Sequence, residues 1–322
     1  MTTVAGDRVP DAVSRRGATG RPPEPAVGPA ADAGSYYGRP VLKQPVWRWP
    51  VPAYLFSGGL AAGSALVASA ARLAGDDRLA QRAQVASLAA VTASAGFLIE
   101  DLGRPSRFHH MLRVARVTSP MSMGSWILAG FGPATGAAAI SGLTGIAPRL
   151  GRVAATAAAA LAPAVASYTA VLLSDTSVPV WHEARFELPF LFTSGAAASS
   201  GALAVLLAGE GRGATGARRL ALAGAAGEVA ASRLMERRLG PLARPYHEGL
   251  PGFLSSAARA LTLAGSAGLL TGRRPAVRAG SALLMAGALL ERFAVFQAGF
   301  PSAADPAYTV VPQRQRLERE GR

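Results

Sequence analysis

The sequence contains no cysteine among its 322 residues. This absence excludes disulfides, thiolate zinc sites, iron–sulfur clusters held by this chain and cysteine nucleophiles. Charged residues are scarce at 16%, whereas an average soluble domain has about 25%. Only four histidines occur, and all of them lie outside the long apolar runs. Because a membrane haem needs axial histidines inside the helices, we expect no haem and no metal on this chain.

The sequence is instead rich in apolar residues and arginine. Half of the residues are hydrophobic, the formal net charge is +14, and Lys43 is the only lysine. The arginines stand in short clusters between apolar runs and are not interleaved with aromatic residues, as a nucleic-acid binder would require. This pattern is typical of a polytopic membrane protein with no nucleic-acid partner.

Eight apolar runs are long enough for membrane-spanning helices, since one span needs about 20 residues. The sixth run is the weakest, because Glu228 interrupts it. Alternation typical of strands is absent. The predicted fold is therefore an all-α integral membrane protein with eight transmembrane helices, at approximately 50–73, 79–101, 121–146, 151–174, 188–209, 215–235, 252–271 and 277–298.

An internal repeat relates the first four runs to the last four. The stretch YLFSGGLAAGSA at 54–65 is similar to FLFTSGAAASSG at 190–201. A Leu-Gly pair also precedes a histidine in both halves, as Leu102-Gly103 before His109 and Leu239-Gly240 before His247. The offset covers four spans, an even number, so both halves have the same orientation and form a parallel repeat. Chance similarity between Ala- and Gly-rich helices is the alternative.

The repeat predicts the domain organisation. Residues 1–48 are rich in Pro, Gly, Arg and Ala and are expected to be a disordered tail. We expect four-helix bundles at 49–175 and 176–300, with a C-terminal tail at 301–322. The loops on the side of both termini carry more arginine than the opposite loops, which places both termini in the cytoplasm and the chain in the plasma membrane.

Ionisable residues of the predicted spans gather toward the side that carries the termini. They are Glu100, Asp101, Asp175, Glu228, Arg233, Arg259, Glu291 and Arg292. Because intramembrane charges are costly and usually functional, Glu228, Arg259 and Glu291 are predicted to form a proton path. The alternative is that Glu291 with Arg259, and Glu228 with Arg233, are ion pairs that only orient the helices.

Two tyrosines lie inside the predicted spans. Tyr54 is about one turn inside the first span, and Tyr168 lies within the fourth. A buried tyrosine hydroxyl needs a hydrogen-bond partner. We therefore expect both hydroxyls to hold the carbonyls of a quinone near Asp101.

Four motifs in order along the chain resemble the NrfD/PsrC family, the membrane subunits of polysulfide reductase-like molybdoenzyme complexes. The resemblance covers about residues 36–300. The motifs are YGRP at 37–40 followed by WRWPVPAYLFSGGLAAGSA at 47–65, IEDLGRPSRFHHMLR at 99–113, TSPMSMGSWIL at 118–128 and SYTAVLLSDTSVPVWHEARFELPFLFTSGAAASSG at 167–201.

The resemblance implies a quinone-reactive membrane anchor that acts only as part of an oxidoreductase complex. Its cofactor would be menaquinone or another quinone, and its partners a four-cluster, ferredoxin-like iron–sulfur subunit and, through it, a molybdopterin catalytic subunit. Tyr54 stands at the place of a histidine that approaches the quinone in the best-understood members, and Tyr168 matches a tyrosine that does so. Asp101 matches the family's acidic position and is the candidate proton relay, with Glu100 beside it.

The loops near these residues are expected to form the docking surface for the iron–sulfur partner. The residues concerned are Arg104, Arg107, His109, His110, His182 and His247. Two other functions stay open from the sequence. One is a passive anchor whose quinone site has decayed, and the other is a proton or solute transporter that uses the path through Glu228, Arg259 and Glu291.

Overall fold

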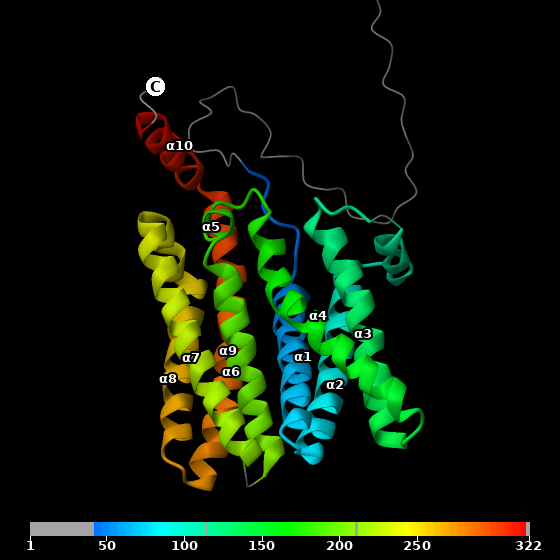
Figure 1. The fold of residues 1–322 in the computed structure, drawn as a ribbon. Coiled ribbons are helices and arrows are strands. Elements are labelled where there is room, and N and C mark those ends of the chain that lie inside the picture. Colours follow the sequence, from blue (N-terminus) through cyan, green and yellow to red (C-terminus); the bar gives the residue numbers. More distant parts are fainter. Residues whose placement is uncertain (1–41, 114, 210–211, 320–322) are drawn as a thin grey trace, which may run out of the picture. The chain divides into compact units, whose positions relative to one another are not determined.

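Eight long helices make up most of the part of the chain that the computed structural model describes, which is residues 42–113, 115–209 and 212–319. Each helix coincides with one of the predicted runs, and several extend a few residues further. No strand occurs in these residues. The helices are α1 (Pro50–Leu73), α2 (Asp77–Asp101), α3 (Pro120–Thr144), α4 (Pro148–Ser174), α6 (Leu188–Ala208), α7 (Arg212–Leu239), α8 (Gly249–Leu270) and α9 (Arg274–Ala304) (Figure 1).

Short helices that no apolar run predicts lie between and after the long ones. They are the 3-10 helices η1 (Pro105–Leu112) and η2 (Gly240–Tyr246) and the α-helices α5 (Pro179–Glu183) and α10 (Ala307–Arg319). Gly103 and Gly240 have φ angles of +66° and +53°. Because only glycine adopts this left-handed backbone at little cost, these two residues end α2 and α7 and turn the chain into η1 and η2.

Local signals in the sequence explain where several long helices begin. Proline occupies the first turn of α1 and α3, where its missing N–H costs no hydrogen bond. The Asp76 side chain caps α2 and accepts a hydrogen bond of 3.0 Å from the Leu79 amide.

Seven helices in the described part are long and apolar enough to cross a membrane, namely α1, α2, α3, α4, α6, α8 and α9. Helix α7 is long enough to cross a membrane, but charged side chains interrupt its apolar residues. One of them is Glu228, which made the sixth predicted run the weakest. Large apolar side chains on the outer helices are more than half exposed, among them Ile140 on α3 and Leu263 on α8. Such side chains are expected where a helix faces lipid.

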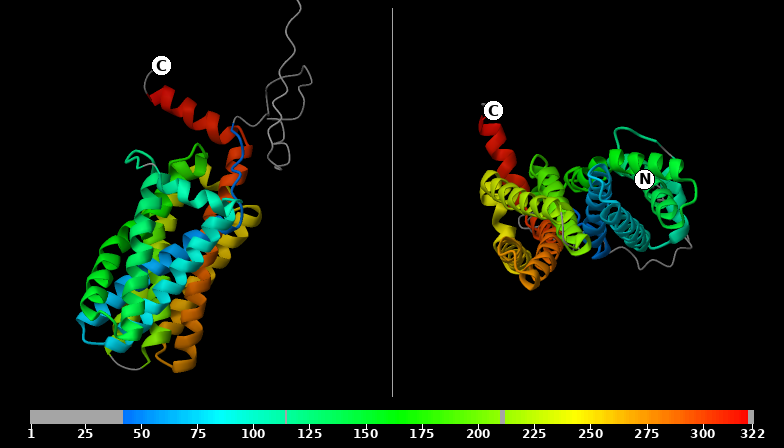
Figure 2. Two further views of the ribbon diagram at one scale, coloured as in Figure 1. Left: turned by 90° about the vertical axis from the view of Figure 1, so that its right-hand side faces the viewer. Right: turned by 60° about the horizontal axis from the view of Figure 1, so that its bottom comes forward.

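Helices α1 and α6 form the centre of the unit that residues 40–322 make. Helix α1 packs against α2, α4, α6 and α9, and α6 packs against α1, α4, α7 and α9 (Figures 1 and 2). In the most apolar window of α1, 83% of residues are buried, against 22% in α3 and 28% in α8. The helices pair similarly in both halves, since α3 lies against α2 and α4 as α8 lies against α7 and α9.

The two similar stretches at 54–65 and 190–201 face each other where α1 crosses α6. A Cβ atom added to Gly63 would lie 2.3 Å from the Ser200 Oγ, and one added to Gly59 would lie 3.3 Å from the Ala196 Cβ. Small residues are therefore what allows the backbones of α1 and α6 to approach closely.

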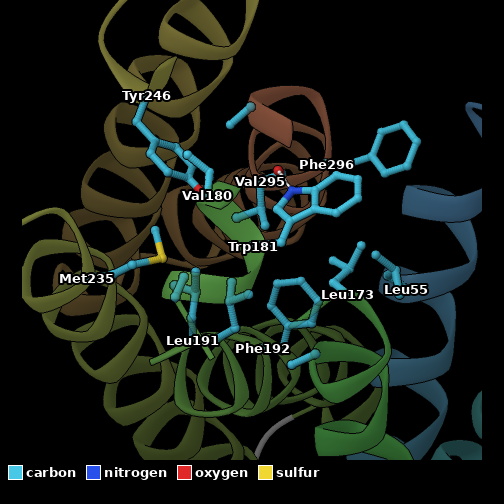
Figure 3. Packing of buried hydrophobic residues seen from close by; sticks show 14 of the residues in the cluster. Leu55, Leu173, Val180, Trp181, Leu191, Phe192, Met235, Tyr246, Val295 and Phe296 are labelled. Carbon is cyan, nitrogen blue, oxygen red and sulfur yellow. Dashed lines mark hydrogen bonds between the residues drawn. The ribbon is translucent and has the colours of Figure 1, made fainter. Parts of the chain in front are cut away.

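The largest apolar cluster surrounds the short helix α5 (Figure 3). The indole of Trp181 lies at its centre, stacked on Trp47 with a centroid distance of 5.8 Å and on Phe296 with 5.9 Å. Its Nε1 donates a hydrogen bond of 2.7 Å to the carbonyl of Val295. These contacts fix α5 to α9 and to the segment that leads into α1. We refer below to the end of the helices that carries α5 as the α5 end.

Candidate functional site

The two tyrosines singled out in the sequence meet between α1 and α4. The hydroxyl of Tyr54 donates a hydrogen bond of 3.1 Å to the hydroxyl of Tyr168. Tyr54 is buried with 4% of its surface exposed, and Tyr168 is partly buried. Neither hydroxyl has another hydrogen-bond partner among the described residues. Two hydroxyls carry two protons, and the bond between them uses one, so the pair keeps one O–H that can donate to an external acceptor.

Glycine and serine residues on the neighbouring helices position this pair. A Cβ added to Gly124 on α3 would lie 1.8 Å from the Cζ of Tyr168, so the phenol ring lies directly against the backbone of α3. The Ser94 hydroxyl on α2 donates a hydrogen bond of 3.3 Å to the Tyr54 carbonyl. All four helices of the first half thus contribute to the surroundings of the pair. Gly124 was not predicted, because nothing in the sequence indicates which glycine of α3 meets the ring.

Asp101 and Glu100 lie at the end of α2, next to the segment before α1. The Asp101 carboxylate is half-buried and faces Arg48. The Arg48 side chain also donates a hydrogen bond of 3.2 Å to the carbonyl of Glu100, whose own side chain is exposed. The structure gives no contact between either carboxylate and the tyrosine pair. Arg48 therefore fixes the end of α2 to the start of α1, a role that the sequence did not suggest.

The predicted docking residues lie at the α5 end, in or beside η1, α5 and η2. Arg104, His109, His110, His182 and His247 are exposed, whereas the side chain of Arg107 lies outside the described residues. The rings of His109 and His110 meet edge to face at 4.2 Å. His182 contacts the carbonyl of Ser174 through its Nδ1 at 3.1 Å. These residues form an accessible basic surface next to the end of α2.

A buried ion pair links α7 to α9. The Glu228 Oε1 lies 3.7 Å from the Arg292 Nη1, and both side chains are almost completely buried. Arg292 also donates a hydrogen bond of 2.6 Å to the carbonyl of Phe192 and lies over that ring at 4.1 Å. The alternative pair of Glu228 with Arg233 is not formed, because Glu228 pairs with Arg292. Residues five apart point to different faces of a helix, and Arg233 is exposed.

Gly195 on α6 provides the space for this ion pair. A Cβ at this position would lie 2.3 Å from the Glu228 Oε1 and 2.7 Å from the Arg292 Nη2. In the sequence, Gly195 stands out only as part of the similar stretch at 190–201. Its contact with two ionisable side chains depends on how α6, α7 and α9 rotate about their axes, which an apolar run does not reveal.

A second group of ionisable residues lies on the same side of α7, nearer its end. Arg259 on α8 donates a hydrogen bond of 2.5 Å to the Glu236 Oε1, and the Ser232 hydroxyl donates one of 3.3 Å to the same atom. Arg259 therefore forms its ion pair with Glu236, while its charge also acts on Glu291, the partner that the structural alternative named. Glu236 and Ser232 were missed, although the spacing 228, 232, 236 places three polar residues on one face of a helix.

The described residues contain no group of three or more His, Asp or Glu side chains that could hold a metal ion. The tyrosine pair can form hydrogen bonds with a ligand, and the carboxylates can bind protons.

Comparison with models of protein families matches residues 40–235 to the family described as polysulphide reductase, NrfD. The matched segment covers more than half of the chain and includes α1 to α6 and most of α7. A comparison with curated proteins found no significant match.

Proposed function

The chain belongs to the polysulphide reductase NrfD family, and from this premise we propose that it exchanges electrons between a membrane quinone and an iron–sulfur partner subunit. Family membership implies a membrane subunit of molybdoenzyme complexes, and the family generally partners with iron–sulfur and molybdenum subunits. Together with the seven apolar helices, it makes the chain a multi-pass membrane protein.

The observation that carries the proposal is the hydroxyl pair of Tyr54 and Tyr168. A quinone carbonyl is a hydrogen-bond acceptor, and the pair keeps one O–H with which to bind it. Gly124 leaves one side of the Tyr168 ring without a Cβ contact, so the position of this phenol is set by the helix backbone. The chemistry of the residues therefore fits a quinone, menaquinone or another, which supplies two-electron redox chemistry when bound.

Asp101, with Glu100 beside it, is the candidate for moving protons between the quinone site and water. Asp101 is half-buried at the α5 end, and Glu100 is exposed there. A carboxylate at this boundary can accept a proton from the membrane side and release it to solvent. The route from the tyrosine pair to Asp101 is part of the proposal.

We further propose that the partner docks at the α5 end. The exposed residues Arg104, His109, His182 and His247 lie on this surface, and Arg107 belongs to the same sequence motif. The partner would be a four-cluster, ferredoxin-like subunit that carries electrons to a molybdopterin subunit. The arginine distribution of the loops favours the plasma membrane with both termini and this surface on the cytoplasmic side.

The proposed architecture is eight crossings in two four-helix bundles, at 49–175 and 176–300. Helix α7 is long enough for a crossing, and its charged residues inside the protein are paired with α8 and α9. The similar helix pairing in both halves supports the parallel repeat.

The test is purification of the tagged chain in mild detergent, followed by quinone extraction and metal analysis of the same sample. Co-purified iron, molybdenum or tungsten and bound quinone would support the proposal. Loss of quinol oxidation in Tyr168→Phe and Asp101→Asn would then assign the site. A complex that assembles without binding quinone would instead identify a passive anchor. A chain free of metal and quinone, under conditions that keep such complexes intact, would overturn the proposal and favour a transporter.

A further inference from the structure

A line of polar groups runs from the exposed α5 end into the second half of the molecule. His247 begins the line, and its Nε2 lies 3.7 Å from the Glu236 Oε2. The His247 side chain is 57% exposed and that of Glu236 is 13% exposed. The line continues along α7 through Ser232 to Glu228, whose side chain is 5% exposed. Eight residues separate Glu236 from Glu228, so the line extends roughly 12 Å into the protein along α7.

The charges along this line do not balance. Among the residues that the structure describes, the three carboxylates of Glu228, Glu236 and Glu291 are accompanied by two guanidinium groups, those of Arg259 and Arg292. If His247 is neutral and all three carboxylates and both guanidinium groups are ionised, the five side chains carry a net charge of −1. An uncompensated charge is costly inside a membrane protein. One bound proton removes this cost.

The other ionisable residues near this group do not compensate the excess charge. Helix α6, which packs against α7 and α9, contributes none. Arg238 at the end of α7 is paired with Glu187, and Arg244 of η2 is paired with Glu248. Burial, followed by the charges of Glu291 and Glu236, raises the pKa of Tyr246. The Tyr246 hydroxyl therefore stays neutral.

The position of Ser232 points to where the proton is held. Its hydroxyl donates a hydrogen bond of 3.3 Å to the Glu236 Oε1, and the Glu291 carboxyl group lies close enough to interact with the same hydroxyl. A serine hydroxyl has one proton and can donate to only one carboxylate at a time. If the other carboxyl group is protonated, it can donate to the Ser232 oxygen, and both contacts are then hydrogen bonds.

Tyr246 supplies an independent sign that this region accommodates a proton. Its hydroxyl is buried, faces Glu291 and Glu236, and has no hydrogen-bond partner in the described part of the chain. Both carboxylate oxygens of Glu228 likewise lack a hydrogen-bond donor there. Buried polar groups are otherwise hydrogen-bonded in native proteins. A carboxylic acid proton is a donor that an ionised set of carboxylates cannot provide.

We infer that the second half of the molecule holds one exchangeable proton, shared among Glu236, Glu291 and Glu228 and taken up through His247. In the uptake step, protonated His247 gives its Nε2 proton to Glu236. Glu236 then passes a proton to the Ser232 oxygen, while the original Ser232 proton moves to Glu291. The net result is neutral His247 and protonated Glu291, with no electron transferred. This inference goes beyond quinone chemistry and does not depend on it.

The experiment is infrared difference spectroscopy of the full chain in detergent, with H₂O exchanged for D₂O. The expected result for the unmodified protein is the C=O band of one protonated carboxylic acid, shifted in D₂O. Glu291→Gln and Glu236→Gln should each abolish this band, because either change leaves two carboxylates and two guanidinium groups. Arg259→Gln should add a second band, because three carboxylates then face one guanidinium.

The matched control is Glu248→Gln, which removes an exposed carboxylate at the same end of the molecule and should leave the band unchanged. His247→Asn should keep the band and slow its shift in D₂O. A protein without the band, or one in which only one of the two Glu→Gln changes removes it, would overturn the shared proton. Whether the band is present is measured on the unmodified protein, so this part of the test does not depend on whether a variant folds. Because no quinone or partner is needed, failure here is distinguishable from failure of the proposed function.

Discussion

The hydroxyl groups of Tyr54 and Tyr168 lie 3.1 Å apart and join α1 to α4 through a single hydrogen bond. Either phenol can donate in this bond, but Tyr54 is buried with 4% of its surface exposed and Tyr168 is only partly buried, so Tyr168 is the more accessible residue of the pair. The two residues are therefore not equivalent for an acceptor that approaches the pair, and substitutions should reveal the difference.

The first prediction concerns this difference. Tyr168→Phe removes the more accessible hydroxyl and should lower kcat/KM for quinol oxidation by the purified complex about tenfold, the equivalent of one hydrogen bond of roughly 1–1.5 kcal/mol. Tyr54→Phe should have a smaller effect, since the Tyr168 hydroxyl remains. Tyr308→Phe in α10 is the control. Equal activity of Tyr168→Phe and the unmodified protein would contradict the proposed quinone contact.

The second prediction concerns the support of the Tyr168 ring. Gly124→Ala places a Cβ 1.8 Å from the Tyr168 Cζ, so the ring must move. Overpacking of this kind costs about 1–3 kcal/mol, and quinol oxidation should fall at least as far as in Tyr168→Phe. Gly132→Ala lies on the same helix and meets nothing within 4 Å.

The outcome of that comparison is read from thermal unfolding and activity together. Gly132→Ala should be neutral or slightly stabilising, because alanine is favoured over glycine in a helix by about 0.5–1 kcal/mol. If Gly124→Ala and Gly132→Ala behave alike in both measurements, the position of the Tyr168 ring does not limit activity.

The third prediction concerns the ion pair of Glu228 and Arg292. Removing one member of a buried pair leaves an uncompensated charge and typically costs 3–5 kcal/mol, on the order of what we expect for Arg292→Gln. The double variant with Glu228→Gln should be more stable than Arg292→Gln alone. Unfolding of the single and double variants in detergent measures this coupling. Additive losses would show that the two side chains do not interact.

The fourth prediction concerns docking at the α5 end. Arg104→Glu reverses an exposed charge beside η1 and should weaken capture of the iron–sulfur partner, most strongly at low salt, because screening acts over about 8–10 Å at ordinary ionic strength. Arg273→Glu, an exposed residue before α9 at the opposite end of the helices, is the matched control. Partner capture should be quantified over a salt series. An equal loss in both variants would argue against docking at the α5 end.

The long helices could be predicted from the sequence because an apolar run of about 20 residues is long enough to cross a membrane as a helix, which satisfies its backbone hydrogen bonds internally. The meeting of Tyr54 and Tyr168 was expected only as a shared site, and their direct hydrogen bond is a finding of the structure. The partner of Glu228 could not be predicted, since Arg292 lies on another helix and the contact depends on helix rotation. The contacts of Gly124 and Gly195 could not be predicted either. The sequence has many glycines, and only the packing of the helices shows which of them lie against a functional side chain.

The contact between α1 and α6 has a consequence for how the molecule could have arisen. Gly59 and Gly63 of the first similar stretch meet Ala196 and Ser200 of the second, so near-equivalent positions touch each other across the interface. Such a surface is self-complementary, as in a two-fold symmetric dimer. Two copies of an ancestral half-length chain could therefore have assembled through it before fusion. In such a history the two halves would diverge after fusion; in this chain the first half carries a pair of phenols and the second carries carboxylates and guanidinium groups.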